Sequence, residues 1–168
     1  WSTYEYGKVT IRGKSELTLD SKENQTSGLD KDYATAWSYG VSESLTLLVP
    51  NFKGGVSEPV ATDQKLLKDV SPQNRQIMSY AYKYHGEQPF TSGPVYIGAI
   101  VFFLFVLGMF VIKSELRWIM FSAAVLSLLL SWGKNFMGLT SFFLDYVPGY
   151  NKFRAVSMIL VIAELVIP

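Results

Sequence analysis

The sequence contains no cysteine and only one histidine, His85. The lack of cysteine excludes disulfide bonds, thiolate metal sites and a cysteine nucleophile. A single histidine argues against a histidine-based metal cluster and against a catalytic triad with several possible bases. We therefore predict no metal site, and the sequence requires no cofactor.

A strong excess of charge is also lacking, since 15 basic and 14 acidic residues give a formal net charge of +1. The charges are unevenly distributed, because most of them fall in residues 1–94 while residues 95–168 are largely apolar. Neither part is basic enough to indicate a nucleic-acid partner.

Long apolar runs dominate the second part. Residues 95–112, VYIGAIVFFLFVLGMFVI, carry no charge, and a helix of this length spans roughly 27 Å, close to the hydrocarbon core of a bilayer. Residues 116–132 form a second apolar run of minimal spanning length, and the link between the two is short enough to predict an antiparallel hairpin. A third run, residues 155–168, is too short to span, so we expect the chain to be an internal piece of a longer protein.

These runs predict an α-helical polytopic membrane protein fragment with the lipid bilayer as its first partner. Three transmembrane helices are expected at about 95–112, 116–132 and 155–168, the third truncated. Residues 133–154 are expected to form an external loop. Residues 1–94 are expected to form a mixed segment outside the membrane, mainly helix and loop. Within it we predict extended pieces in residues 1–19 and helices at 33–48 and about 72–84.

Charge alone does not orient the chain. The short link offers Lys113 and Arg117, whereas the longer connection offers Lys134, Lys152 and Arg154. The positive-inside rule therefore does not decide between them. Connectivity does require that residues 1–94 and 133–154 lie on the same side, where the two segments can form one surface.

Three candidate site residues flank the apolar runs. Lys152 and Arg154 stand at the start of the third run, where they can clamp a lipid-linked phosphate or simply anchor the helix in the headgroup region. Glu87 precedes the first run in a Pro- and Gly-rich stretch, where it can act as an acid/base, hydrogen-bond a sugar hydroxyl, or cap a backbone amide.

Four further residues carry weaker signals. Asp145 can bind a metal, orient Arg154 or cap the following Pro-Gly turn. Asn51 and Lys53 lie in a Gly-Gly loop that can bind phosphate through backbone amides, although a simple turn is the more common use of such a loop. Glu164 falls inside the third apolar run, where an acid lines a pathway or takes part in hydrogen-bonded packing.

Several blocks, in this order, resemble the YfhO-like bacterial membrane proteins in their Bacteroidetes form. The blocks are WSYG at 37–40, LTLLVPNFKGG at 45–55, GEQPFTSGPVY at 86–96, SWGKN at 131–135 and DYVPGYNKFR at 145–154. The resemblance covers nearly the whole chain, with the apolar runs between the blocks.

That family looks related to the GT-C membrane glycosyltransferases, which move a sugar from a polyprenyl-phosphate carrier to an acceptor outside the cytoplasm. The resemblance implies a multi-pass protein of the bacterial cytoplasmic membrane, with residues 1–94 and 133–154 outside and residues 113–117 inside. It implies a polyprenyl-phosphate sugar and a cell-envelope acceptor as partners, and a divalent cation by family analogy. The catalytic acid of such enzymes lies near the first membrane helix, before the part of the protein represented here.

Two alternatives stay open at this point. The protein can be a transporter or flippase of a lipid-linked or polymeric envelope substrate, with Glu164 in its pathway. It can also be a non-catalytic scaffold in an envelope assembly. Fold analogy alone does not separate these functions.

Overall fold

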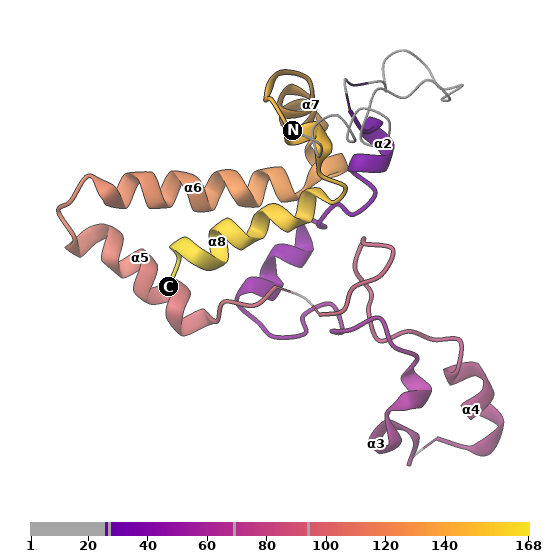
Figure 1. The fold of residues 1–168 in the computed structure, drawn as a ribbon. Coiled ribbons are helices and arrows are strands. Elements are labelled where there is room, and N and C mark those ends of the chain that lie inside the picture. The colour runs from indigo at the N-terminus through magenta and orange to yellow at the C-terminus, as the bar shows by residue number, and fades with distance from the viewer. Residues whose placement is uncertain (1–25, 27, 69, 94) are drawn as a thin grey trace, which may run out of the picture.

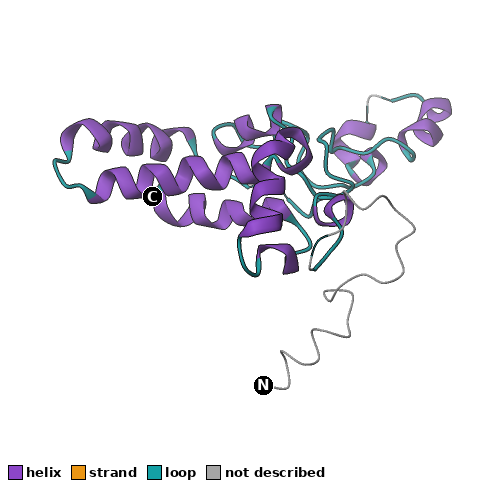
Figure 2. Ribbon diagram, turned by 90° about the horizontal axis from the view of Figure 1, so that it is seen from above, coloured by secondary structure: helices purple, strands orange, loops and turns teal. Residues whose placement is uncertain are grey.

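The computed structural model describes residues 26, 28–68, 70–93 and 95–168, and in this part of the chain it is built from helices and loops (Figures 1 and 2). The only β-type pairing among these residues is an isolated antiparallel bridge between Pro59 and Tyr82. The extended pieces predicted in residues 1–19 lie outside the described residues. The α-helices are α2 (Lys31–Ala34), α3 (Gln64–Leu67), α4 (Pro72–Met78), α5 (Ala99–Val111), α6 (Leu116–Ser131), α7 (Met137–Tyr146) and α8 (Leu160–Val166). Short 3-10 helices are η1 (Ser42–Leu47), η2 (Val60–Thr62), η3 (Gly133–Phe136), η4 (Tyr150–Lys152) and η5 (Val156–Ile159).

Helices α5 and α6 form the predicted antiparallel hairpin. They are shorter than the apolar runs, with 13 and 16 residues. At 1.5 Å per residue they span roughly 20 and 24 Å. Among the described residues, no single helix is both long and apolar enough to cross a bilayer, although α6 and the 133–146 segment pass that test as a pair bent by 109°.

Helix α8 lies between the diverging α5 and α6 (Figure 1). Its buried Ala163 and the following Ile167 pack against Ala124 of α6, and Val101 and Phe105 of α5 close the cluster. Small side chains at 124 and 163 let the backbones of α6 and α8 approach closely, which is a common solution for apolar helices in contact.

The chain turns sharply at Gly133, directly after α6. Gly133 has φ +47°, and in the segment 133–154 the residues as far as Tyr146 form η3 and α7. Thr140 and Leu144, one helical turn apart, are buried on the inner face of α7. The Thr140 hydroxyl donates to the carbonyl oxygens of Gly133 or Phe136 at 3.0 and 3.1 Å, which fixes the start of α7 against the bend.

The prediction of one helix over residues 33–48 is wrong. Only the end of α2 and the whole of η1 fall in this segment, and residues 35–41 between them are not helical. The Tyr39 N–H donates to the Ser131 carbonyl at 2.8 Å instead of to a carbonyl one turn earlier. Val41 and Leu45, which the predicted face would bury, are 50% and 45% exposed.

The second predicted helix is shorter than expected, since α4 ends at Met78. Helices α3 and α4 form a small excursion away from the hairpin (Figure 1). Its base is held by the Lys83 ammonium, which lies 3.6 Å from Glu58 and 3.7 Å from Asp63. Ile77 and Tyr80 are largely exposed there, so this excursion buries little of its own apolar surface.

Candidate functional site

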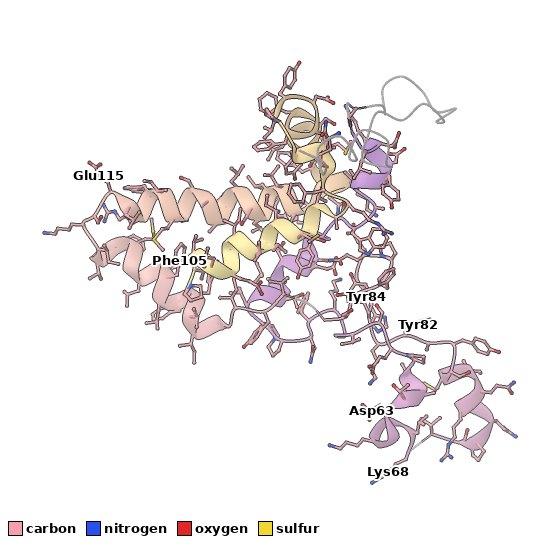
Figure 3. All side chains as sticks on the ribbon, in the orientation of Figure 1. Asp63, Lys68, Tyr82, Tyr84, Phe105 and Glu115 are labelled. Atoms are coloured by element: carbon pink, nitrogen blue, oxygen red, sulfur yellow. The ribbon has the colours of Figure 1, made fainter. Side chains whose placement is uncertain are left out.

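The two polar segments meet at the end of α6 that is remote from the hairpin link. Tyr84 lies at this end in Figure 3, whereas Glu115 marks the opposite end of α6. The Trp132 indole N–H donates to the Ser44 hydroxyl at 2.9 Å, and the Lys134 backbone N–H donates to Ser38 Oγ at 2.8 Å. The segment around residues 38–44 is therefore fastened to the bend between α6 and α7.

A buried carboxylate, Glu43, organises this region. Its side chain is 2% exposed and accepts hydrogen bonds from the backbone N–H groups of Gly40 at 2.7 Å and Glu87 at 3.1 Å. The Tyr84 hydroxyl donates to the other carboxylate oxygen. Since a buried carboxylate needs donors for its oxygens, these bonds make the burial of Glu43 tolerable.

Two glycines leave room for the Glu43 carboxylate. A Cβ on Gly86 would lie 2.0 Å from Glu43 Oε1 and 2.1 Å from the Tyr84 hydroxyl. A Cβ on Gly40 would lie 2.9 Å from Glu43 Oε2 and 3.0 Å from Glu87 Oε1. The glycines of the WSYG and GEQPF blocks therefore permit the close approach of two carboxylates.

Glu87 connects this region to the bend after α6. Its Oε2 accepts a hydrogen bond from the Asn135 side-chain amide at 2.7 Å, and the same amide is 3.2 Å from the Tyr39 carbonyl. We call Glu43, Tyr84, Glu87 and Asn135 the carboxylate cluster. Glu87 and Asn135 are its exposed members, and Glu87 presents a carboxylate that can accept a hydrogen bond or a proton from a bound hydroxyl.

The phenols near the cluster are held in their protonated form. Burial, followed by the hydrogen bond to Glu43, raises the pKa of Tyr84. Burial also raises the pKa of Tyr39, with the negative charges of Glu43 and Glu164 acting in the same direction. Tyr84 is therefore a hydrogen-bond donor throughout the physiological pH range.

Arg154 lies against the aromatic side chains of the 31–40 segment. Its guanidinium carbon is 4.8 Å from the centre of the Trp37 ring and 5.3 Å from that of Tyr33. The Trp37 ring also packs edge-on against Phe90, with the ring centroids 5.3 Å apart. We call these four residues the arginine–aromatic stack. Trp37 is the shared ring of this stack. It contacts Phe90, which follows Glu87 in the chain, and Arg154, which precedes α8.

The guanidinium of Arg154 is positioned by stacking and makes no hydrogen bond to any described residue. Because a cation–π contact uses none of the N–H groups for a hydrogen bond, the donors of this guanidinium stay available. An exposed, oriented fork of donors of this kind is suited to a phosphate group.

Asp145 does not join either group. Its carboxylate is 2.8 Å from the Lys31 ammonium and so connects α7 to α2. No group of three or more His, Cys, Asp or Glu residues is placed to hold a metal ion in the described part of the chain. Asp145 therefore has a structural role in fixing α2, which in turn carries Tyr33 toward Arg154.

The Lys31–Asp145 pair should contribute modestly to stability, because the two side chains are 13% and 38% exposed. A double-mutant cycle with Lys31→Ala and Asp145→Ala, followed by thermal unfolding, is expected to give a coupling energy of about 0.5–1 kcal/mol. Screening should reduce the coupling in 1 M salt, by roughly half or more. A coupling energy of zero at low salt would show that this ion pair does not contribute to stability.

Lys152 lies on η4, beside the buried Asn151. The Asn151 carbonyl accepts a hydrogen bond from the Leu29 N–H at 2.9 Å, and the Lys152 N–H donates to the Gly149 carbonyl at 3.1 Å. The nearby phenol of Tyr150 is buried, which raises its pKa to about 12. The backbone of η4 thus supports the segment that leads to Arg154.

Asn51 and Lys53 lie in a turn. Asn51 adopts a left-handed conformation with φ +55°, and its carbonyl accepts the Gly54 N–H at 2.8 Å. The Lys53 carbonyl accepts the His85 N–H at 2.8 Å. A Cβ on Gly54 would lie 1.6 Å from the Lys83 carbonyl oxygen, so this glycine is required for packing against the backbone of Lys83 and Tyr84.

Glu164 is exposed on α8, and its charge is close enough to Tyr39 to affect that phenol. Glu43, Tyr84 and Asn135 were not predicted as site residues. Glu43 and Asn135 each lie in a polar stretch next to an apolar one, and only the tertiary fold brings them together. Comparisons of the chain with protein-family models, curated proteins and solved structures gave no match.

Proposed function

We propose that the chain is part of a multi-pass protein of the bacterial cytoplasmic membrane, with α5, α6 and α8 in contact with lipid. The support is the apolar surface that these helices leave uncovered. Large apolar side chains with exposed fractions above one half include Ile100, Phe103, Leu104, Phe110 and Val111 on α5, Leu116, Trp118 and Ile119 on α6, and Val161 and Leu165 on α8. So many large apolar side chains exposed on three neighbouring helices are rare on proteins surrounded by water.

The activity that we propose is transfer of a sugar from a polyprenyl-phosphate carrier to a cell-envelope acceptor, as the resemblance to the YfhO-like and GT-C proteins implies. The observation that supports it is the meeting of two polar segments at one end of the apolar helices. An exposed carboxylate and an oriented guanidinium are held there, by Asn135 and by the aromatic rings of Tyr33 and Trp37.

Each group has a defined role in this proposal. Arg154 binds the phosphate of the carrier through its in-plane N–H donors, and it stabilises the negative charge that grows as the sugar–phosphate bond breaks. Glu87 accepts a hydrogen bond from a sugar hydroxyl and so orients the sugar. The buried Glu43 positions Glu87 through the Glu87 N–H.

The test is Arg154→Ala in the full-length protein, reconstituted in lipid nanodiscs. Loss of the guanidinium is expected to weaken binding of a polyprenyl phosphate roughly tenfold or more, because charge-assisted hydrogen bonds are lost. Trp37 fluorescence is a suitable readout, since this ring contacts Arg154. Lys134→Ala is the matched control, because Lys134 is an exposed cation next to the same bend.

Equal affinity of Arg154→Ala and the wild type would remove Arg154 from the site. Polyprenyl-phosphate binding without any sugar transfer by the wild type would instead favour the transport alternative. In the transport alternative, the pathway includes Glu164, which is an exposed acid on an otherwise apolar helix.

A further inference from the structure

Phe90 is an exposed aromatic residue that is nevertheless held in a fixed place. The residue is 59% exposed. Its ring meets the Trp37 ring edge-on, with 5.3 Å between the centroids and an angle of 84° between the ring planes. Because such a contact covers only part of a ring, Phe90 presents open aromatic surface within the arginine–aromatic stack.

The backbone on both sides of Phe90 is restrained. The Ser57 N–H donates to the Thr91 carbonyl at 2.9 Å, and the Thr91 N–H donates to Ser57 Oγ at 2.8 Å. Pro89 comes directly before Phe90, and its ring restricts its own φ and the conformation of Gln88. A ring presented from a restrained backbone loses little freedom when a ligand binds, so its contact is retained as affinity.

The open ring lies near both charged groups of the proposed site. The centre of the Trp37 ring is 5.3 Å from that of Phe90 and 4.8 Å from the Arg154 guanidinium carbon, so Phe90 and the guanidinium are at most about 10 Å apart. Glu87 precedes Phe90 by three residues, which limits the distance between their Cα atoms to about 11 Å. These limits keep all three groups within reach of one sugar phosphate.

The three groups recognise different parts of such a ligand. The guanidinium of Arg154 matches phosphate oxygens, and the carboxylate of Glu87 accepts a hydrogen bond from a hydroxyl. Neither group is suited to the C–H face of a pyranose ring, which is the apolar part of a sugar. A flat aromatic ring covers that face and removes it from water.

We infer that Phe90 stacks on the pyranose ring of the lipid-linked sugar and makes the site prefer the sugar-loaded carrier to the bare carrier. The inference rests on the proposed function, because it names a substrate contact in the same site. Arg154 contacts the phosphate, which both forms of the carrier have, whereas Phe90 contacts only the loaded form. The bare polyprenyl phosphate, which is a product of sugar transfer, therefore binds more weakly and is released.

The experiment compares the two forms of the carrier on the full-length protein in lipid nanodiscs. A radiolabelled polyprenyl phosphate is displaced by the same unlabelled compound, or by that compound carrying glucose, mannose or galactose. The wild type is expected to bind at least one hexose form roughly fivefold to tenfold more tightly than the bare form. Phe90→Ala is expected to reduce this preference to less than about twofold and to leave the affinity for the bare form unchanged.

Two further variants separate stacking from other uses of an exposed apolar side chain. Phe90→Trp keeps a flat aromatic face and should keep the preference, whereas Phe90→Leu keeps apolar bulk without that face and should lose most of it. Phe142→Ala is the matched control, because Phe142 is a phenylalanine of similar exposure, 54%, on α7. It should change neither affinity.

The inference is overturned if Phe90→Ala keeps the preference, or if Phe90→Leu keeps as much of it as Phe90→Trp. Equal effects of Phe90→Ala and Phe142→Ala would also overturn it, since Phe90 would then act only as an anchor in the headgroup region. Arg154→Ala is expected to weaken both forms by the same factor. Equal binding of all forms by the wild type would overturn the inference alone, whereas binding of none would overturn the proposed function with it.

Discussion

Replacing Glu43 with alanine is expected to destabilise the protein more than any other single side-chain truncation in the described part of the chain. The buried carboxylate accepts hydrogen bonds from two backbone N–H groups and from the Tyr84 hydroxyl. Its removal leaves these donors without an acceptor, at about 1–3 kcal/mol for each buried group that stays unpaired. We expect a total loss of roughly 3–5 kcal/mol in the free energy of unfolding.

Thermal unfolding of the full-length protein in detergent measures this effect. Glu43→Gln is expected to lose less, roughly 1–3 kcal/mol, because the amide keeps one acceptor oxygen. Glu115→Ala is the matched control, since Glu115 is exposed at the far end of α6 (Figure 3) and should change stability by less than about 0.5 kcal/mol. Equal unfolding temperatures for Glu43→Ala and Glu115→Ala would show that Glu43 is not the buried centre of the cluster.

Gly133→Ala is expected to have the second largest effect. Its φ of +47° disfavours any residue with a Cβ. The added Cβ would also lie 2.1 Å from Ser38 Oγ and 2.6 Å from Val156 Cγ2. Ser38 is not free to move, because its hydroxyl donates to the Thr35 carbonyl at 2.6 Å and accepts the Lys134 N–H at 2.8 Å. The expected cost is roughly 2–4 kcal/mol.

The control for this substitution is Gly138→Ala, five residues further along the chain. A Cβ on Gly138 meets no atom within 4 Å, and the residue lies inside α7. Alanine there should leave stability unchanged or raise it by about 0.5–1 kcal/mol, because it favours helix. Similar unfolding temperatures for the two variants would mean that the bend after α6 tolerates a Cβ and is not fixed by Gly133.

The hairpin of α5 and α6 follows from the sequence because apolar runs and a three-residue link are local features. The structure of residues 33–48 cannot be predicted from local sequence features in the same way. Its apolar spacing predicts one helix, but the Tyr39 N–H bonds the distant Ser131 carbonyl and the Gly40 N–H bonds the Glu43 side chain. The bond to Ser131 is a long-range contact, and the bond to Glu43 is a side-chain contact three residues away. Both override the apolar periodicity, which by itself predicts neither.

The candidate site could be predicted only in part, because local sequence features single out some of its residues but do not show which residues contact one another. Glu87 and Arg154 stand out in the sequence because each adjoins an apolar run and each is charged. Glu43 was missed because it falls on the polar side of a helix that does not form. Asp145 was a candidate partner of Arg154, but it pairs with Lys31 instead. In each of these cases, the contact partners of the residue are set by the tertiary fold.

The bend of 109° between α6 and the segment that contains α7 has a geometric consequence for a protein in a bilayer. When α6 runs along the membrane normal, α7 lies nearly flat in the plane of the membrane. The exposed rings of Phe142 and Tyr146 then rest at the level of the lipid headgroups, where aromatic side chains are favoured. In the function that we propose, a helix at this boundary fixes the depth of the protein in the bilayer. Glu87 and Arg154 would then lie near the level of the headgroups, where the phosphate of the proposed lipid carrier is.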